Sequence, residues 1–222
     1  ALTKALAEAR KDFEDEPAGA VAVWPGGAQI FSAGSDVFAG AGYGTARGGS
    51  YGVTRRRLTK PLIVAVEGIA AGGGFEIALA ATLVVASESA TFLLPEVNLG
   101  LIAECGALFR GPRALPRNLA RELLLTGQPL DARRAYQIGF VSELTAPGEA
   151  LAGAARLAAT IAARAPLSIR ETLAALTALD DELDLKGWET TERARAVVRS
   201  SQDAVEGVAA FGAKRAPQWT GT

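Results

Sequence analysis

Carboxylates are among the candidates for acid/base chemistry in this chain, because it contains no histidine. Without histidine, Ser-His catalysis, Cys-His catalysis and histidine-based metal sites are excluded. Proton transfer near neutral pH then falls to carboxylates, lysine, tyrosine, the single cysteine or water. Glu76 follows three glycines, and Glu96 follows an apolar run that ends in Leu94-Pro95. Taken alone, a carboxylate in such a context is partnered, exposed or functional.

The glycines before Glu76 indicate a strand-to-helix junction that approaches another group closely. Gly72, Gly73 and Gly74 lead into an alanine-rich helix that carries Glu76 in its first turn. Free amides and the positive end of the helix dipole at such a start suit an oxyanion. A tight turn with packing glycines fits the same residues. No Gly-Lys-Ser/Thr follows, so the motif is not a P-loop.

A second candidate amide lies in the turn 32–36, which reads Ser-Ala-Gly-Ser-Asp. Small residues after a strand let the backbone pack along a thin ligand and leave the Ser35 amide free. An ordinary turn has the same composition. The arginines at 55–57 and the pair Lys214-Arg215 are open to two interpretations, a solvated face or a landing site for a phosphate-bearing ligand.

Strands that alternate with helices, followed by helices alone, predict an α/β core with a C-terminal helical extension. An amphipathic helix opens the chain, buried strands are expected at 20–24, 62–66, 83–87, 91–94 and 140–144, and residues 101–108 are expected to form an apolar loop. Helices are expected at 75–83, from Pro116 to Gly127, after Asp131, and from 151 onward, with Asp203 and Glu206 as a capping-box pair. No internal repeat is evident. We therefore expect a core over 1–147 and a helical extension over 148–222.

The overall composition is that of a globular protein with no excess of positive charge to attract nucleic acid or an anionic membrane. Lysine and arginine number 23 against 24 acidic residues, so the net charge is −1. That balance predicts no nucleic-acid partner, and no apolar run reaches the length of a membrane span. One cysteine, Cys105, excludes an internal disulfide and is compatible with a cytoplasmic location.

Several blocks occur together in an order that closely resembles the enoyl-CoA hydratase (crotonase) superfamily. They are FSAGSD, KPLIVAVEGIAAGGGFEIALA, ATFLLPEVNLGLI, ELLLTGQPLDARRAYQIGFVSEL and DAVEGVAAFGAKRAPQW. The resemblance covers about residues 1 to 222, and its finer features are most similar to a carnitinyl-CoA dehydratase-like branch. It implies a spiral of ββα units, acyl-CoA thioester substrates, no cofactor beyond coenzyme A as part of the substrate, and no metal. It also implies a homotrimer or homohexamer, with the extension over 148–222 taking part in oligomerisation.

The resemblance also implies roles for individual residues. The thioester oxyanion hole falls on the amides of Ser35 and Gly73, Glu76 holds and activates water, and Glu96 exchanges the proton at the α-carbon. Two glutamates in one desolvated site cannot both ionise cheaply, so their titrations separate into a base and an acid. Coenzyme A contacts are implied for residues around the turn, namely Ala33, Ser35, Asp36, Val37, Phe38 and Gly73.

The sequence departs from the family pattern at three places. The strand pair that usually precedes the first helix is expected to be absent. Phe38 stands where a lysine often contacts coenzyme A, and Glu104 stands where a small residue usually borders the site. Glu104 could bind a substrate cation, perturb the glutamate pair or point to solvent, and we expect a role in substrate selection.

Three functions fit these residues. The two glutamates favour a hydro-lyase that hydrates 2-enoyl-CoA or dehydrates a 3-hydroxyacyl-CoA such as carnitinyl-CoA. Isomerisation of 3-enoyl-CoA to 2-enoyl-CoA needs only one carboxylate and would tolerate Glu76→Gln. A non-catalytic acyl-CoA-binding or RNA-binding protein is the third, and the near-neutral charge argues against RNA.

Overall fold

Short strands and longer helices alternate along the chain in the computed structural model, which describes residues 2–16, 19–38 and 44–222. The strands are β1 (Ala22–Pro25), β2 (Ile30–Ser32), β3 (Leu62–Val66), β4 (Ile69–Ala71), β5 (Leu83–Ser87), β6 (Thr91–Leu93), β7 (Leu130–Asp131) and β8 (Glu143–Thr145). The helices are α1 (Leu2–Asp15), α2 (Gly73–Ala80), α3 (Ala107–Ala114), α4 (Arg117–Thr126), α5 (Ala132–Gln137), α6 (Ala150–Ala162), α7 (Pro166–Arg199) and α8 (Gln202–Gly212), with 3₁₀ turns η1 (Ser50–Gly52) and η2 (Pro95–Leu99).

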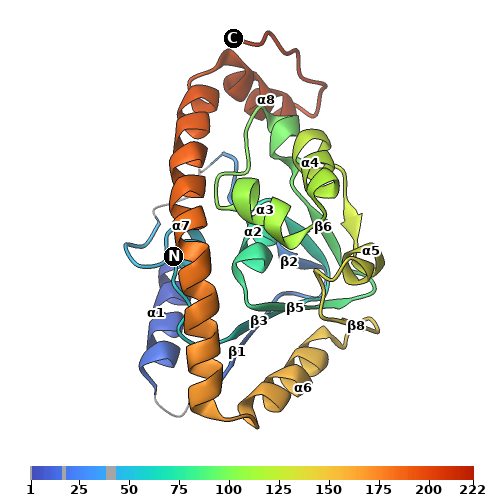
Figure 1. Ribbon diagram of the computed structural model, residues 1–222. Helices are drawn as coiled ribbons and strands as arrows, with labels where there is room; N and C mark the ends of the chain where they lie inside the picture. The colour runs from blue at the N-terminus through green and yellow to red at the C-terminus, as the bar shows by residue number, and fades with distance from the viewer. Residues whose placement is uncertain (1, 17–18, 39–43) are drawn as a thin grey trace.

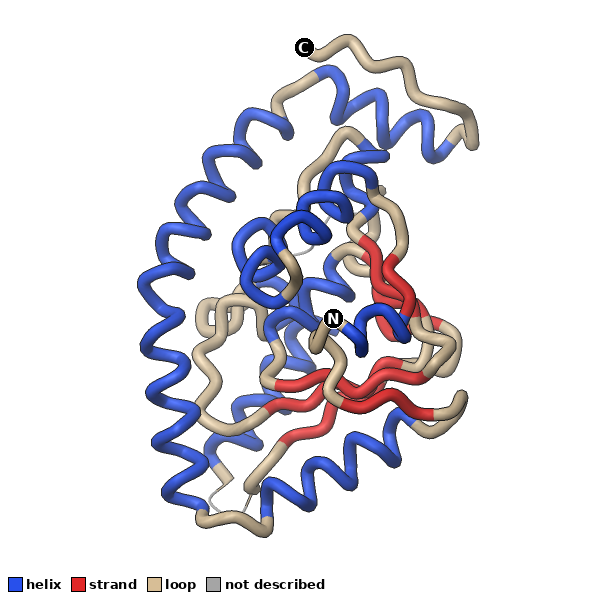
Figure 2. The backbone as a smooth tube through the Cα atoms, turned by 45° about the vertical axis from the view of Figure 1, so that its right-hand side comes forward, coloured by secondary structure: helices blue, strands red, loops and turns tan. Residues whose placement is uncertain are grey.

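The strands form two sheets, and each successive pair of strands contributes one member to each sheet. One sheet has the order β1-β3-β5-β8 and is parallel throughout, and the other has the order β2-β4-β6-β7. The pairs β1/β2, β3/β4 and β5/β6 therefore repeat one unit as the chain advances (Figure 2). This is the expected α/β spiral of ββα units, and it contains a structural repeat that is not evident in the sequence.

The parallel sheet is covered on both faces. Alternate residues of β3 separate into two clusters: Val64 packs with Phe75 of α2, whereas Ile63 packs with Ala150 and Ala154 of α6. On the first face, Phe75 and Phe92 lie with ring centroids 5.2 Å apart, and Phe140 packs against both. A strand buried on both faces reads as a continuous apolar run, which is why 62–66 was predicted correctly.

The C-terminal region is helical, as expected. Helix α7 runs along one side of the molecule, and α8 lies at its end beside the C-terminus (Figure 1). The predicted capping box at the start of α8 is wrong, because Ser201 is the N-cap and accepts the Ala204 amide. None of the described helices has the length and apolarity that crossing a bilayer requires.

Two predictions of local structure in the first half of the chain also need correction. Residues 69–71 form strand β4, which is not among the strands that the sequence predicts. Residues 107–114 form α3, whereas 101–108 had been predicted as loop. Both elements border the candidate site, since β4 leads into Gly72 and α3 begins beside Glu76.

Candidate active site

The two candidate oxyanion amides are brought together by contact between the turn after β2 and the start of α2. Gly34 has φ +78°, and a β-carbon added there would lie 2.7 Å from the Gly73 nitrogen. A β-carbon on Gly74 would lie 2.1 Å from the Ser32 carbonyl oxygen. Only glycine allows both the positive φ and this close approach. The glycines therefore let the turn after β2 pack against the start of α2, as expected for a tight turn with packing glycines. This packing sets the Ser35 and Gly73 amides side by side.

Both amides are available to a ligand. Within the described residues, neither the Ser35 nor the Gly73 amide donates a hydrogen bond. Gly73 is the first residue of α2, where the helix leaves amides without an internal partner. Two unpaired donors at one place, with the positive end of a helix dipole behind them, can stabilise a negatively charged oxygen.

Glu76 is held in an almost fully buried position on α2. Glu76 is 2% exposed. Its Oε1 accepts hydrogen bonds from the amides of Cys105 at 2.7 Å and Ala107 at 3.1 Å. Burial raises the pKa of Glu76 to about 7, against the opposing effect of the Ala107 and Cys105 amides. The two amides favour the ionised form, so Glu76 is suited to be the base of the pair.

Glu96 reaches the same place from η2. Its Oε1 would be 3.0 Å from a β-carbon on Gly72, the residue that precedes Gly73 and has φ +52°. Its Oε2 is buried, and no described group hydrogen-bonds to it. Burial, and then the charge of Glu76, raise the pKa of Glu96 to about 8. A carboxyl group without a donor for one oxygen holds its proton, which suits Glu96 to be the acid.

Glu104, the third carboxylate, is tied to α7. Its two oxygens pair with Arg199 at 2.5 and 3.0 Å, and Arg195 Nε lies 3.0 Å from Oε2. Both oxygens are therefore engaged by arginines, and neither is left for a substrate cation. The geometry favours a structural tie over the expected role in substrate selection.

The arginines that had been considered for phosphate binding are also paired. Arg55 bonds Glu192, Arg57 pairs with Asp181, and buried Arg56 makes a two-point contact with Glu14. Arg215 likewise makes a two-point contact with Glu206. These pairings correspond to a solvated or structural face for 55–57.

The turn residues expected to contact coenzyme A lie at the surface near α8. Ala33, Asp36 and Phe38 are exposed, and Val37 is partly exposed. Asp36 accepts the Phe38 amide at 2.8 Å, and the Phe38 ring lies 6.1 Å from that of Phe211 on α8. Phe38 thus has an apolar neighbour in place of the ionic contact that a lysine would make.

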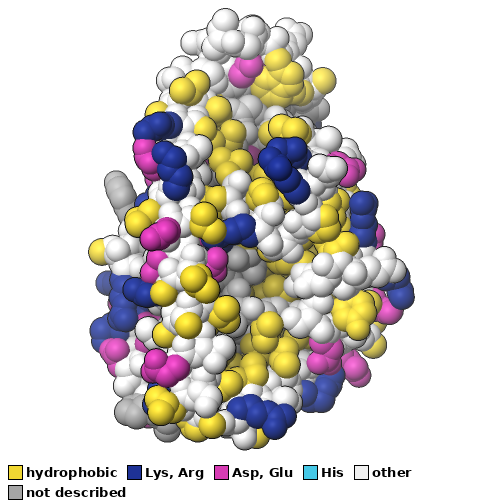
Figure 3. All heavy atoms as spheres, viewed as in Figure 1, with side chains coloured by type: hydrophobic (Ala, Val, Ile, Leu, Met, Phe, Trp, Pro, Cys, Tyr) yellow, Lys and Arg dark blue, Asp and Glu magenta, His cyan; other side chains and the backbone are white. Residues whose placement is uncertain are grey.

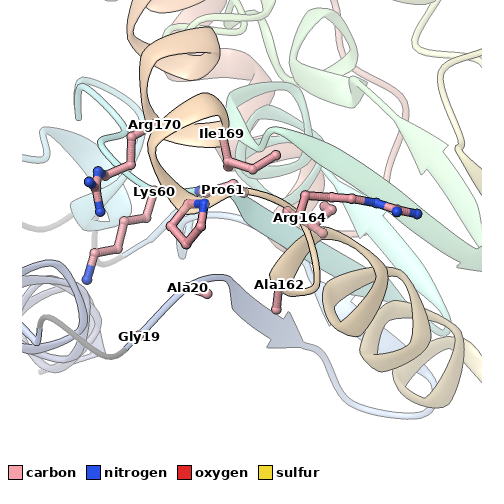
Figure 4. Close-up of a pocket in the computed structure, with 10 residues that line it drawn as sticks. Gly19, Ala20, Lys60, Pro61, Ala162, Arg164, Ile169 and Arg170 are labelled. Atoms are coloured by element: carbon pink, nitrogen blue, oxygen red, sulfur yellow. The ribbon is translucent and has the colours of Figure 1, made fainter.

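Two cavities elsewhere in the molecule are lined by neither the two glutamates nor the residues of the two amides. One, of about 120 Å³, lies beside Lys60, Pro61 and Ile169, with Arg164 and Arg170 at its rim (Figure 4). The other, of about 850 Å³, lies between α7 and the loop that carries Arg55, Arg56 and Arg57. Lys60 is already bonded to the carbonyls of Phe13 and Glu16 at the end of α1. The carboxylates that line the larger cavity, Asp180, Asp181 and Asp184, are paired with arginines.

Sequence reasoning missed three participants in the site. The Cys105 and Ala107 amides hold Glu76, and no side-chain pattern announces a backbone donor. The third is Tyr51, whose hydroxyl lies 2.7 Å from Ser35 Oγ. It stands in the glycine-rich loop 44–52, and glycines on either side of an aromatic residue were the available signal.

The chain is similar to known proteins along almost its whole length. A carnitinyl-CoA dehydratase from Salmonella typhi is 37% identical over 98% of this chain and 87% of its own length. A solved carnitinyl-CoA dehydratase from Mycobacterium avium superposes with a TM-score of 0.92 at 38% identity, covering 100% of this chain and 89% of the other. A solved enoyl-CoA hydratase from Mycobacterium tuberculosis has a TM-score of 0.75 at 41% identity, covering 99% and 88%. The family model described as enoyl-CoA hydratase/isomerase matches residues 1–222, and the chain therefore belongs to that family.

Proposed function

We propose that this protein is a hydro-lyase that adds water to 2-enoyl-CoA thioesters and, in reverse, dehydrates 3-hydroxyacyl-CoA thioesters of the carnitinyl-CoA type. The observation that carries the proposal is the pair of a buried Glu76 and a half-buried Glu96 beside two amides that no described residue accepts from. Relatives named carnitinyl-CoA dehydratase and enoyl-CoA hydratase support the same reaction class. Coenzyme A enters as part of the substrate, and the reaction transfers no electrons to a further cofactor.

The chemistry assigns one role to each group. Ionised Glu76 takes a proton from water as the water oxygen bonds to the β-carbon. The double-bond electrons move toward the thioester oxygen, and the amides of Ser35 and Gly73 stabilise the resulting enolate. Protonated Glu96 then delivers its proton to the α-carbon. Each such amide contributes about 2.7–4 kcal/mol of transition-state stabilisation in comparable sites.

The protonation state supports this division. With pKa values of about 7 for Glu76 and about 8 for Glu96, the pair carries one proton near neutral pH. Their charges repel each other across a desolvated site, so ionising the second carboxyl is harder than ionising the first. A pair holding one proton supplies the base and the acid that hydration needs at the same time.

The test is a set of turnover assays on the purified protein. Crotonyl-CoA and the enoyl-CoA of the carnitine series are offered separately, and loss of the conjugated enoyl-thioester absorbance is followed. A 3-enoyl-CoA is offered in parallel, and gain of that absorbance is followed. The proposal requires hydration of at least one 2-enoyl thioester. Absence of hydration together with isomerisation of the 3-enoyl thioester would replace it by an isomerase.

We also propose that the chain assembles as a homotrimer or homohexamer. Leu176, Leu179 and Leu183 recur at helical spacing on α7, and each is more than half exposed. Apolar side chains gather along α7 and between α7 and α6 on the face drawn in Figure 3. A row of this kind is typical of subunit contact. Light scattering should give three or six times the mass of one chain, and Leu179→Glu should lower it; a monomer would contradict the proposal.

A further inference from the structure

Tyr51 delivers a hydroxyl group to the candidate oxyanion hole from a loop that the other site residues do not use. Its hydroxyl oxygen lies 2.7 Å from Ser35 Oγ. The same oxygen lies 2.0 Å from the position that a β-carbon on Gly73 would take, so the Tyr51 hydroxyl packs against the Gly73 α-carbon. Ser35 and Gly73 are the residues whose amides form the hole, and the Tyr51 hydroxyl therefore borders both.

The backbone around Tyr51 is built to place this side chain. Tyr51 has φ 56° and ψ 7°, a left-handed conformation that is rare for an aromatic residue. Gly49 and Gly52 on either side also have positive φ, of 62° and 74°. Departures of this kind persist only where surrounding structure enforces them, and they cluster at functional sites.

The hydroxyl has a proton to give. Burial, followed by the nearby Cys105 thiol, raises the pKa of Tyr51 above its usual range, and Glu76 and Glu96 act in the same direction. The side chain therefore stays protonated throughout the working range of pH. When the Ser35 hydroxyl donates to Tyr51, the Tyr51 proton is free to be donated to a third atom.

We propose that Tyr51 is a further catalytic residue, a third hydrogen-bond donor to the thioester oxygen beside the Ser35 and Gly73 amides, oriented by the Ser35 hydroxyl. The inference rests on the proposed function for the identity of the acceptor, since a thioester oxygen bound by these two amides is the ligand atom that the hydroxyl faces. As the enolate forms, the oxygen gains negative charge and the hydrogen bond from Tyr51 strengthens. The proton stays on Tyr51.

The first arm of the test uses turnover. Tyr51→Phe keeps the ring and removes only the hydroxyl, so kcat for hydration should fall about 100-fold, at the lower end of losses for an oxyanion-hole donor. KM should change less than about threefold, because the bond strengthens chiefly in the transition state. Ser35→Ala keeps the amide but loses the orienting hydroxyl, and it should cost less than Tyr51→Phe. The double variant should be no slower than Tyr51→Phe alone.

The second arm does not depend on turnover. Crotonyl-CoA labelled with ¹³C at the thioester carbonyl is bound to Glu96→Gln protein, with and without Tyr51→Phe, and the carbonyl stretch is recorded by infrared difference spectroscopy. Removing a donor should move the band to higher frequency. An unmoved band with an unchanged kcat would overturn the inference, even where the wild-type protein hydrates crotonyl-CoA. Failure of the wild-type protein to hydrate any enoyl thioester would overturn the proposed function, and the band would still decide the role of Tyr51.

Discussion

The carboxylate of Glu76 accepts the amide of Cys105 at 2.7 Å, and through that bond the base is held by the loop that α7 anchors. The residue before Cys105 is Glu104, whose oxygens pair with Arg195 and Arg199 on α7. A long helix thus fixes the segment whose amides position the base and oppose its protonation. Helix α7 is thus linked to Glu76 through the Arg199–Glu104 ion pair and the hydrogen bond from the neighbouring Cys105 amide.

Substitutions of Glu104 and of Arg199, which pair with each other, should move the pH profile of kcat/KM in opposite directions. The negative charge of Glu104 raises the pKa of both Glu76 and Glu96. Glu104→Gln removes that charge and should shift the kcat/KM profile to lower pH, whereas Arg199→Ala leaves the charge less neutralised and should shift it upward. A partly exposed ion pair is worth up to about 1 kcal/mol, and even if all of that were lost in the transition state, kcat would fall only about fivefold.

Arg193→Ala is the matched control for this pair of variants. Arg193 stands on the same helix and pairs with Glu189 on its exposed side. Its replacement should leave the profile in place. Shifts of equal sign in Glu104→Gln and Arg199→Ala would show that the tie only stabilises the fold.

The pH dependence of wild-type activity should be bell-shaped with its maximum between about pH 7 and 8. Activity requires ionised Glu76, whose pKa is about 7, and protonated Glu96, whose pKa is about 8. The rate should fall below the maximum as the base is protonated and above it as the acid ionises. Residual activity of Glu96→Gln should lack the alkaline limb. A profile flat from pH 6 to 9 in the wild-type protein would contradict the assignment.

Gly34→Ala should abolish most activity and should destabilise the fold by more than the strain of its positive φ alone. A β-carbon at Gly34 would press on the Gly73 nitrogen at 2.7 Å and separate the two amides. Gly139 has φ 82°, close to the 78° of Gly34, but nothing lies within 4 Å of its added β-carbon. Gly139→Ala should lose about 1–2 kcal/mol of stability through its positive φ, and Gly34→Ala should lose more, because the backbone at Gly73 must also shift. Only Gly34→Ala should lose about 100-fold or more in kcat, and equal activity of the two would refute the close-contact argument.

Neutralising Glu96 should stabilise the fold at alkaline pH. Its pKa in the folded protein is raised to about 8, well above that of a glutamate in an unfolded chain. Between these two pKa values the folded state therefore binds more protons than the unfolded chain. Stability from this group is present at low pH and is lost as pH rises toward 8. Denaturant unfolding of Glu96→Gln should show a gain on the order of 1–3 kcal/mol at pH 8 over wild type, with little gain at pH 4. Replacement of exposed Glu88 by Gln should leave the pH dependence as in wild type.

Sequence pattern was sufficient for the elements that are buried on both faces or carry clear capping residues. Strand β3 and helix α5 with its Asp131 cap are examples, because a continuous apolar run and a side chain that accepts the Arg134 amide are local signals. Strand β4 and helix α3 were missed, since β4 has only three residues and α3 contains Gly111 and Pro112. Their identity depends on neighbours distant in sequence.

The candidate site was predictable in its side chains and less so in its backbone. Glu76, Glu96, Ser35 and Gly73 were identified through the family resemblance, and the structure brings them together. The tie of Glu104 to α7 spans 95 residues, and the amides that hold Glu76 lie 29 and 31 residues away. Contacts over such separations are products of the fold, and no local pattern encodes them.

The most direct test of the two-glutamate account is hydration by Glu76→Gln and Glu96→Gln, each compared with wild type on the best 2-enoyl-CoA substrate at pH 7.5. Glutamine keeps the size of each side chain and removes its ability to exchange a proton. General acid or base catalysis contributes on the order of 10²–10⁴-fold, so each variant should lose at least about 100-fold in kcat while still binding the substrate. Retention of near wild-type hydration by either variant would contradict the role assigned to that glutamate.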